Sequence, residues 1–400
     1  MSNKARHVAP KTKAPAAEKP QEAGVPTASA RSRKAVPTRR KIIVIAVVVV
    51  AALIILGEIA YLIFGHFYTK LDRVQRMDND ELNAAIAAYI AEEEAAPPIE
   101  EAPEDIPDDI IIATEDEVND IQAQIQAALA ANGGSKISDD DVINILLIGS
   151  DARSRTERAR SDVMILVSLN KKTEHIAVTS FMRDIYTYIP NYGYNKLNAP
   201  YAIAGADYLI QTLEDDFGIS IDNYAAVNFY AFADVIDAIG GVDVYLDNSE
   251  VDFINTFVSE QAAMGIGTGS AWLDYTNGDY AHLNGTQALA HCRNRRIGNG
   301  DFSRTERQRE VVYAMIQKAR TLSLTELYDL ADTVLPLVTT DLSQGDCLSL
   351  LLDSGTYLGY FVETMQIPDV DYYLTMINGM SVIRIDFSEN AAVLKELIYG

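Results

Sequence analysis

Two groups of charged residues in this 400-residue chain have the types and spacing needed to bind an anion. The first lies in residues 144–184, which hold seven Lys or Arg and five Asp or Glu. The second lies in residues 291–309, which hold six Arg against Asp301 and Glu306. Both groups are net positive in a chain whose formal charge is −24. Positive segments in an acidic protein indicate an anionic ligand.

Three apolar runs, at residues 142–148, 163–169 and 175–181, must position the first group. Their length and β-branched content are typical of strands. In an antiparallel meander, the loop between the first two strands and the exit of the third lie at the same end of the sheet. Five charged side chains then gather there: Asp151, Arg160, Asp162, Arg183 and Asp184. Solvated strand ends are the alternative, which the net positive charge of the segment disfavours.

The second group carries its own argument for phosphate binding. On a strand, Arg293 and Arg295 share one face. Residues 303–306, Ser-Arg-Thr-Glu, fit a capping box, which predicts a helix that begins at Ser303 and places Arg304 and Gln308 on one side. Guanidinium groups and the free N–H groups of a helix start bind phosphate oxygens. An ion-pair network is the usual explanation of such a cluster, but few acidic residues lie nearby in the sequence to form it.

The N-terminal part of the chain predicts a membrane anchor. Residues 1–41 are rich in Ala, Pro, Lys and Arg without apolar periodicity, which indicates a disordered basic tail. Residues 42–64 are apolar for long enough to cross a bilayer as a helix. Basic residues precede this run and acidic residues follow it, so we expect the tail in the cytoplasm and the rest of the chain outside the cell membrane.

The remainder of the chain divides by composition into a spacer and a folded domain. Residues 65–136 are acidic and Pro-containing with helical stretches, which predicts an extended, partly helical spacer. Residues 137–400 alternate between strand and helix patterns, which predicts a layered α/β sandwich with both faces of a sheet covered. Within this domain we expect a helix over 201–217 and an irregular segment over 251–285.

The chain carries few of the common catalytic signatures. It has no Walker loop, no G-x-S-x-G and no H-E-x-x-H. Cys292 and Cys347 are its only cysteines, and in a domain with a large core we expect buried thiols rather than a disulfide framework. Enzymes of these classes are therefore not indicated.

Seven short motifs occur in a fixed order along the chain, at residues 149–153, 160–162, 183–184, 196–198, 283–289, 293–295 and 301–308. Together they resemble the LytR–CpsA–Psr family. The resemblance covers roughly residues 142–320, and the layout of anchor and external domain also matches. The chain departs from the family at Met182, where a Pro is usual, and at Cys292, where an aliphatic residue is usual. Neither departure replaces a charged group.

The resemblance implies an α/β/α sandwich with a central mixed sheet and a phosphotransferase activity. Such an enzyme moves a glycopolymer from an undecaprenyl-pyrophosphate carrier to peptidoglycan in a Gram-positive-type envelope. It implies that Asp151 and Asp162 hold Mg²⁺, with Mn²⁺ as an alternative, and that a further set of residues contacts the pyrophosphate. These are Arg160, Arg183, Arg293, Arg295, Arg304 and Gln308.

Several alternatives stay open at this point. Asp162, Arg183 and Asp184 are the expected catalytic residues, but Asp184 is either the proton acceptor or a structural partner of an Arg. A polyprenyl tail requires an apolar tunnel, and for residues 201–217 and 224–232 ordinary core is the better interpretation. A pyrophosphate hydrolase would use the same residues. A non-enzymatic regulator is the weakest hypothesis, because the tail and the Arg cluster lie on opposite sides of the membrane.

Overall fold

The computed structural model describes residues 64–95, 110–132, 136–150, 159–263 and 272–400. These residues all belong to the larger of two compact units, residues 60–400. The expected basic tail and all but the last residue of the expected transmembrane segment lie outside the described residues. Within the described ranges, no helix has the length and apolar character needed to cross a membrane.

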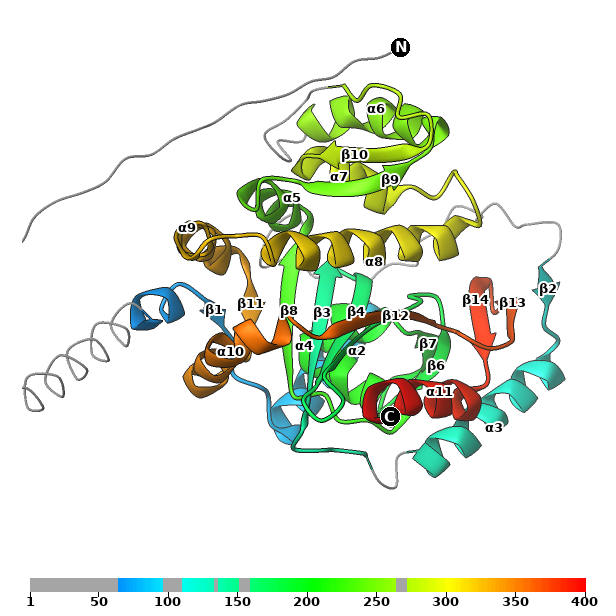
Figure 1. Ribbon diagram of the computed structural model, residues 1–400. Coiled ribbons are helices and arrows are strands. Elements are labelled where there is room, and N and C mark those ends of the chain that lie inside the picture. The colour runs from blue at the N-terminus through cyan, green and yellow to red at the C-terminus, as the bar shows by residue number, and fades with distance from the viewer. Residues whose placement is uncertain (1–63, 96–109, 133–135, 151–158, 264–271) are drawn as a thin grey trace, which may run out of the picture. The chain divides into compact units, whose positions relative to one another are not determined.

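A seven-stranded mixed sheet forms the centre of this unit (Figure 1). The predicted meander is confirmed, because β4 pairs antiparallel with both β3 and β5. The neighbouring strands β8 and β12 run parallel to β3 and β5, which makes the sheet mixed. Its order is β1 (Asp72–Arg73), β11 (Thr339–Thr340), β8 (Asn223–Asn228), β3 (Val142–Ser150), β4 (Ser161–Asn170), β5 (His175–Phe181) and β12 (Phe361–Ile367).

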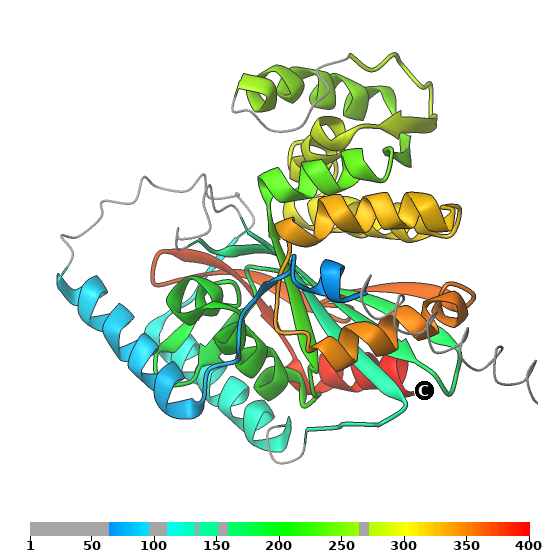
Figure 2. The same ribbon diagram turned by 90° about the vertical axis from the view of Figure 1, so that its left-hand side faces the viewer.

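Helices cover both faces of the sheet, so the predicted three-layer α/β/α architecture is confirmed (Figures 1 and 2). One face packs against α3 (Glu115–Asn132), α4 (Ala199–Phe217) and α11 (Phe387–Tyr399). The other face packs against α8 (Gly300–Ala319) and α10 (Gln344–Tyr357).

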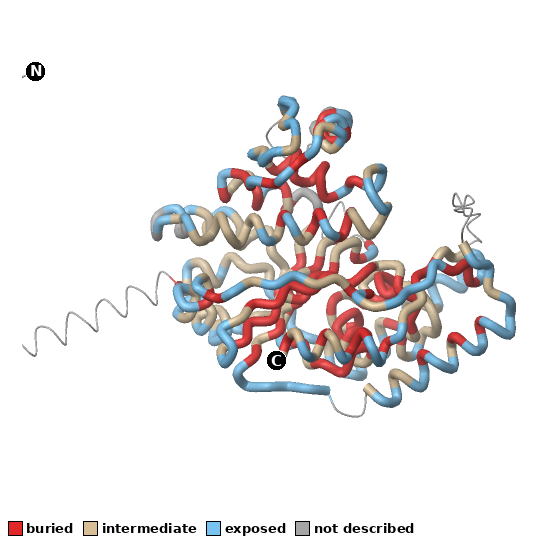
Figure 3. Tube along the Cα trace, turned by 45° about the vertical axis from the view of Figure 1, so that its right-hand side comes forward, coloured by how far each residue is buried: buried red, intermediate tan, exposed pale blue. Residues whose placement is uncertain are grey.

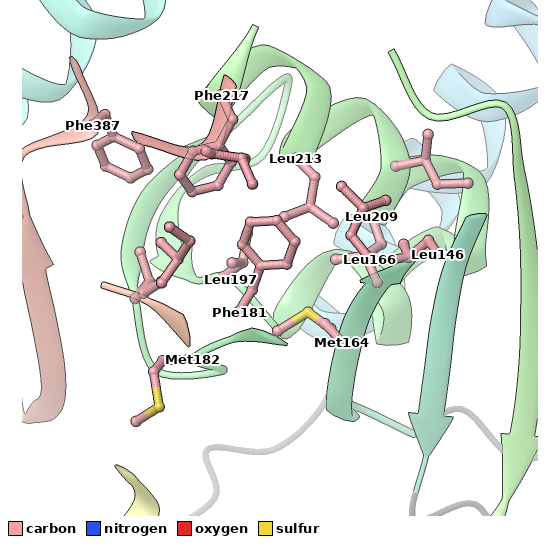
Figure 4. Packing of buried hydrophobic residues seen from close by; sticks show 14 of the residues in the cluster. Leu146, Met164, Leu166, Phe181, Met182, Leu197, Leu209, Leu213, Phe217 and Phe387 are labelled. Carbon is pink, nitrogen blue, oxygen red and sulfur yellow. The ribbon is translucent and has the colours of Figure 1, made fainter. Parts of the chain in front are cut away.

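The main core lies between the sheet and α4 (Figure 4). Residues of β3 alternate between buried and half-buried, since successive side chains of a strand point to opposite faces and each face is covered by helices. Leu146, Leu166 and Phe181 of the sheet meet Leu213 and Phe217 of α4 in this core. The apolar residues of α4 therefore serve as core, which agrees with the preferred interpretation of this helix.

A second hydrophobic cluster lies in a smaller layered group on the far side of α8 from the sheet (Figures 1 and 3). The predicted irregular segment over 251–285 lies in this group, and the prediction is wrong, because most of α6 and all of β10 fall within it. Val251, Ile254 and Val258 lie on one side of a helix and are buried, so their spacing is that of an amphipathic helix. The elements of this group are α5 (Phe229–Ala238), β9 (Val242–Leu246), α6 (Asn248–Ala263), β10 (Asp279–Leu283) and α7 (Gly285–Arg293).

The predicted spacer contains two helices that pack against the folded unit and do not form an open, extended segment. In α3, Ile121 and Ile125 are part of the main core. In α2 (Asn79–Ala95), Leu82 and Ile86 pack with Tyr208 of α4. The apolar residues of these helices recur at helical spacing, and their burial outweighs the repulsion between exposed acidic residues. These helices are therefore part of the folded unit.

Smaller elements complete the unit. A helix, α9, lies between α8 and β11, and two small sheets pack beside the main one. Near the C-terminus, β13 and β14 pair antiparallel as a hairpin. The elements are β6 (Tyr186–Ile189), β7 (Gly193–Lys196), α9 (Leu324–Val334), β2 (Ile111–Ile112), β13 (Tyr372–Ile377) and β14 (Met380–Ile385).

Two glycines permit close approaches that set the geometry around the charged residues. At Gly149, where the β3–β4 register shifts, an added Cβ would lie 2.9 Å from Cβ of Val163. At Gly285, the first residue of α7, an added Cβ would lie 2.0 Å from the carbonyl oxygen of Ala233 in α5. Only glycine allows α7 to pack this closely on α5. Asn284 and Gln287 form a capping box that begins α7 at this point.

We predict that Gly285→Ala lowers the free energy of unfolding by about 1–3 kcal/mol, because the added methyl group overpacks the contact between α5 and α7. Gly355→Ala is the control, since Gly355 lies in α10 and an added Cβ would meet nothing within 4 Å. It should instead raise stability by about 0.5–1 kcal/mol, through helix propensity. Thermal melts of both variants measure the difference, and equal melting temperatures would contradict the packing argument.

Candidate functional site

The turn after β5 brings one arginine between two carboxylates. Nη1 of Arg183 lies 2.6 Å from Asp162 on β4, and Nε lies 3.2 Å from the adjacent Asp184. The backbone holds this turn, because the carbonyl of Arg183 accepts from Asn198 and that of Asp184 accepts from Ile383 of β14. Phe181 and Met182, immediately before Arg183, are buried in the main core (Figure 4). The predicted gathering of Asp162, Arg183 and Asp184 is thus confirmed.

Two further residues, Arg160 and Asp151, were predicted to join this group. Arg160 precedes β4 and is exposed. Asp151 lies outside the described residues. Its predicted place beside Asp162 therefore stays a prediction.

The second group takes a different local structure from the predicted one. Arg293 ends α7 with an exposed side chain, and Asn294 is the C-cap, so Arg293 and Arg295 do not share a strand face. The helix α8 begins at Gly300, before Ser303, because Asn299 is its N-cap. Ser303 lies inside the first turns and its hydroxyl accepts from the backbone N–H of Asn299. The predicted capping box at residues 303–306 is therefore wrong.

The prediction that Arg304 and Gln308 lie on one side of a helix is confirmed. Both residues lie in α8 and are buried, with the Arg304 side chain only 4% exposed. Gln308 donates from Nε2 to the carbonyl of Cys292 at 3.3 Å, which ties α8 to the end of α7. Cys292 itself is a buried free thiol and Cys347 is a half-buried one, as expected from the cysteine count.

Asp301, which sequence reasoning did not assign to the site, joins the two groups of arginines. Its Oδ1 lies 3.1 Å from Nε of Arg295 and 3.1 Å from Nη2 of Arg304, and its Oδ2 lies 3.9 Å from Nη2 of Arg183. The contacts of Oδ1 have ion-pair distances but not the alignment of hydrogen bonds. Its spacing three residues before Arg304 on a helix was the signal that could have identified it.

Lys196 is a second residue that the sequence undervalued. Its Nζ lies 2.9 Å from Oδ1 of Asp184, and both side chains are largely buried. Among the residues that the structure describes, these contacts join four cations to three carboxylates. The cations are Arg183, Lys196, Arg295 and Arg304, and the carboxylates are Asp162, Asp184 and Asp301.

The pKa values of the two buried arginines shift in opposite directions. Burial, together with the positive charge of Arg183, lowers the pKa of Arg304 to about 10, and the carboxylate of Asp301 offsets this only in part. Burial raises the pKa of Asp184, but Arg183 and Lys196 outweigh that effect and leave the pKa below its usual value. Burial opposes the charge of Arg183, yet the carboxylates of Asp184, Asp162 and Asp301 raise its pKa. An added anion near Arg304 would relieve this imbalance.

Other arginines of the second group do not belong to the site. Nε of Arg307 lies 2.8 Å from Glu250 of α6, and its Nη groups donate to two backbone carbonyls. Arg309 donates to the side chain of Gln366 on β12 at 2.9 Å. The ion-pair interpretation that the sequence left as an alternative is therefore correct for Arg307, which connects α6 to α8.

The fold and this cluster define an α/β protein with a group of partly buried cations and carboxylates at one end of its central sheet. The sequence pattern of the LytR_cpsA_psr family matches residues 110–398, and the chain belongs to this family.

Relatives and solved structures extend the comparison. The chain is 36% identical over 65% of its length to the Halalkalibacterium halodurans polyisoprenyl-teichoic acid–peptidoglycan teichoic acid transferase TagU, covering 80% of that protein. It is 35% identical over 54% of its length to the Bacillus anthracis protein of the same name, covering 65% of it. Two structures of TagT, one bound to LIIa-WTA and one to an octaprenyl pyrophosphate lipid, match with TM-scores of 0.53 and 0.50. They are 27% and 26% identical, and each match covers 66% of this chain and 94% of that one.

We predict that inorganic pyrophosphate raises the melting temperature of the protein, because a bound anion stabilises the folded state, by about 2.7 kcal/mol at 100 times its dissociation constant. Arg304→Gln should remove this stabilisation. Arg307→Gln is the matched control: it changes the same residue type one turn along α8, outside the cationic site. It should lower the starting melting temperature but keep the response to pyrophosphate. Equal responses in both variants would place the anion elsewhere.

Proposed function

We propose that this chain is a membrane-anchored phosphotransferase that moves a glycopolymer from a polyprenyl-pyrophosphate carrier to peptidoglycan. The observation that carries the proposal is the cluster in which Asp301 joins Arg183 to Arg295 and Arg304. Family membership and the names of the relatives support the same activity. The apolar run at residues 42–64 and its basic flank support an anchor, with the folded unit outside the cell membrane.

The proposed reaction is a phosphoryl transfer. A hydroxyl oxygen of the acceptor glycan attacks the phosphorus that carries the glycopolymer and forms a new phosphodiester. The bond between this phosphorus and the oxygen that bridges it to the second phosphate breaks, which leaves the polyprenyl phosphate. The hydroxyl proton passes to a base. Arginines around the diphosphate stabilise the negative charge that develops on the leaving phosphate.

We assign the diphosphate-binding role to Arg183 and Arg304, which both contact Asp301. Arg160, Arg293, Arg295 and Gln308 are the further residues that we propose for this role. Because Asp184 contacts both Arg183 and Lys196 and has a lowered pKa, a structural role is better supported for it than a role as base. Asp184 thus serves to hold these two cations in place.

Mg²⁺ is the metal that we propose for the reaction, held by Asp151 and Asp162. In the described part of the chain, no group of three or more His, Cys, Asp or Glu side chains could hold a metal ion. Mg²⁺ typically takes one or two carboxylates and completes its shell with phosphate oxygens and water. A pair of aspartates beside a bound diphosphate fits that requirement, and the ion would neutralise phosphate charge there.

We predict that Arg183→Ala reduces transfer about a hundredfold or more, because it removes stabilisation of the transferring phosphoryl group. Asp162→Ala should abolish transfer too. The assay incubates the full-length protein in bilayers with a polyprenyl-pyrophosphate-linked saccharide, Mg²⁺ and peptidoglycan, and measures covalently attached saccharide. Chelation with EDTA should stop transfer and added Mg²⁺ should restore it.

Arg309→Ala is the control, since Arg309 contacts Gln366 rather than the cluster, and it should keep near-normal activity. Circular dichroism checks that each variant is folded. Near-normal transfer by folded Arg183→Ala would refute the assigned site. Free phosphorylated saccharide without attachment would instead identify the protein as a pyrophosphate hydrolase.

A further inference from the structure

The ribbon formed by β9 and β10 exposes aromatic side chains on one face. Tyr245 and Tyr280 are directly opposite each other, 54% and 70% exposed, and their ring centroids are 5.9 Å apart at 80°. The next pair on the same face is Asp243 and His282, which are hydrogen-bonded at 2.8 Å and exposed. We call these four residues the tyrosine platform.

The platform rests on a rigid base. The alternate residues Val242, Val244, Leu246 and Leu283 point the other way and are buried in the second hydrophobic cluster. The platform therefore holds its shape without a ligand, and a ligand would not have to order it on binding. Cross-strand aromatic pairs also stabilise a sheet by a few tenths to about 1 kcal/mol. That alone does not require both rings to be this exposed.

The charged residues near the platform are acidic, in contrast to those of the cationic site. Residues 197–292, which contain both strands of the ribbon, hold 14 Asp or Glu and no Lys or Arg. The segment leading into β10 adds Tyr275, 59% exposed, whose hydroxyl donates to Asp252 at 2.7 Å. Near the two tyrosines, the exposed carboxylates of Asp243, Asp247 and Asp279 favour a ligand with hydroxyl donors and apolar ring faces over a polyanion.

We infer that the tyrosine platform binds the glycan strand of the peptidoglycan acceptor. Pyranose rings offer C–H faces that pack on exposed aromatic rings, and their hydroxyls donate to carboxylates such as that of Asp243. The N-acetylated sugar backbone carries no charge of its own, so the carboxylates beside the tyrosines do not repel it. This inference rests on the proposed function, because that function supplies the acceptor.

One short helix separates the platform from the cationic site along the chain. The last residue of β10, Leu283, is followed at once by the N-cap of α7, and α7 ends at Arg293. A glycan strand that contacts both places would have a raised effective concentration at the site, because its two contacts are linked.

The test uses the full-length protein in detergent and peptidoglycan sacculi stripped of teichoic acid. The double variant Tyr245→Thr/Tyr280→Thr keeps β propensity but removes both rings. It should lose about tenfold or more of its binding to sacculi. Tyr373→Thr is a matched control, since Tyr373 is also on a strand and is also 54% exposed. It should bind like the unaltered protein.

A kinetic measurement separates this role from a structural one. For long glycan strands as acceptor, the double variant should raise KM about tenfold with kcat unchanged, whereas transfer to a disaccharide acceptor should stay the same. This is the pattern expected when binding away from the reacting atoms is lost. Tyr280→Trp keeps an aromatic ring and should retain binding even if the double variant does not fold.

Unchanged sacculus binding by the folded double variant would overturn the inference. So would an equal loss in Tyr373→Thr, or a loss in Tyr280→Trp as large as in the double variant. Because binding to sacculi is measured without any reaction, a protein that binds through the platform yet transfers nothing would refute the proposed function and leave this inference standing.

Discussion

The arrangement of Arg183 between Asp162 and Asp184 is the interaction on which the charged site depends. A guanidinium that is largely buried requires carboxylates around it, and here they come from a strand, from the adjacent residue and, at 3.9 Å, from α8. Removing such a charge from water is costly unless it is compensated. The site therefore exists only when the sheet, the turn after β5 and α8 are all in place.

The core of the protein serves this arrangement. Phe181 and Met182 fix the end of β5 in the main core, so Arg183 emerges from a rigid position. On the other face of the sheet, Val312 and Ile316 of α8 pack in the same hydrophobic cluster as Ile165 of β4. This packing holds α8, and with it Arg304, against the sheet. The same helix is tied to α6 through Arg307 and Glu250. The helix α8 thus connects the central sheet to the smaller layered group that carries the tyrosine platform.

The two binding sites proposed for this protein differ in the charge of the residues around them. The cationic cluster is suited to a diphosphate, whereas the long segment without Lys or Arg is suited to an uncharged or hydroxyl-rich ligand. A transferase that joins an anionic donor to a neutral acceptor needs to keep the two apart until they meet at one phosphorus atom. Two separate binding sites of opposite charge would keep donor and acceptor apart without a conformational change.

The sequence by itself determined the strands of the meander, the layered fold and most of the charged residues, because strand periodicity and charge are local properties. It also determined the family, through motifs whose order the chain preserves. It failed where local signals compete: residues 251–285 hid a helix among Gly and polar residues, and Ser303 suggested a helix start that Asn299 supplies instead.

Only the tertiary structure decided which charges meet. Arg304 and Arg307 are three residues apart and look alike in the sequence, yet one faces Asp301 in the cationic site and the other faces Glu250. Glu250 is 57 residues away from Arg307, and Asp301 reaches Arg183 only because α8 lies across the sheet. The contact between Asp301 and Arg304 follows from their spacing on one helix. The contacts of α8 with Glu250 and Arg183 depend instead on how the helix packs against α6 and the sheet, which no spacing along the chain encodes.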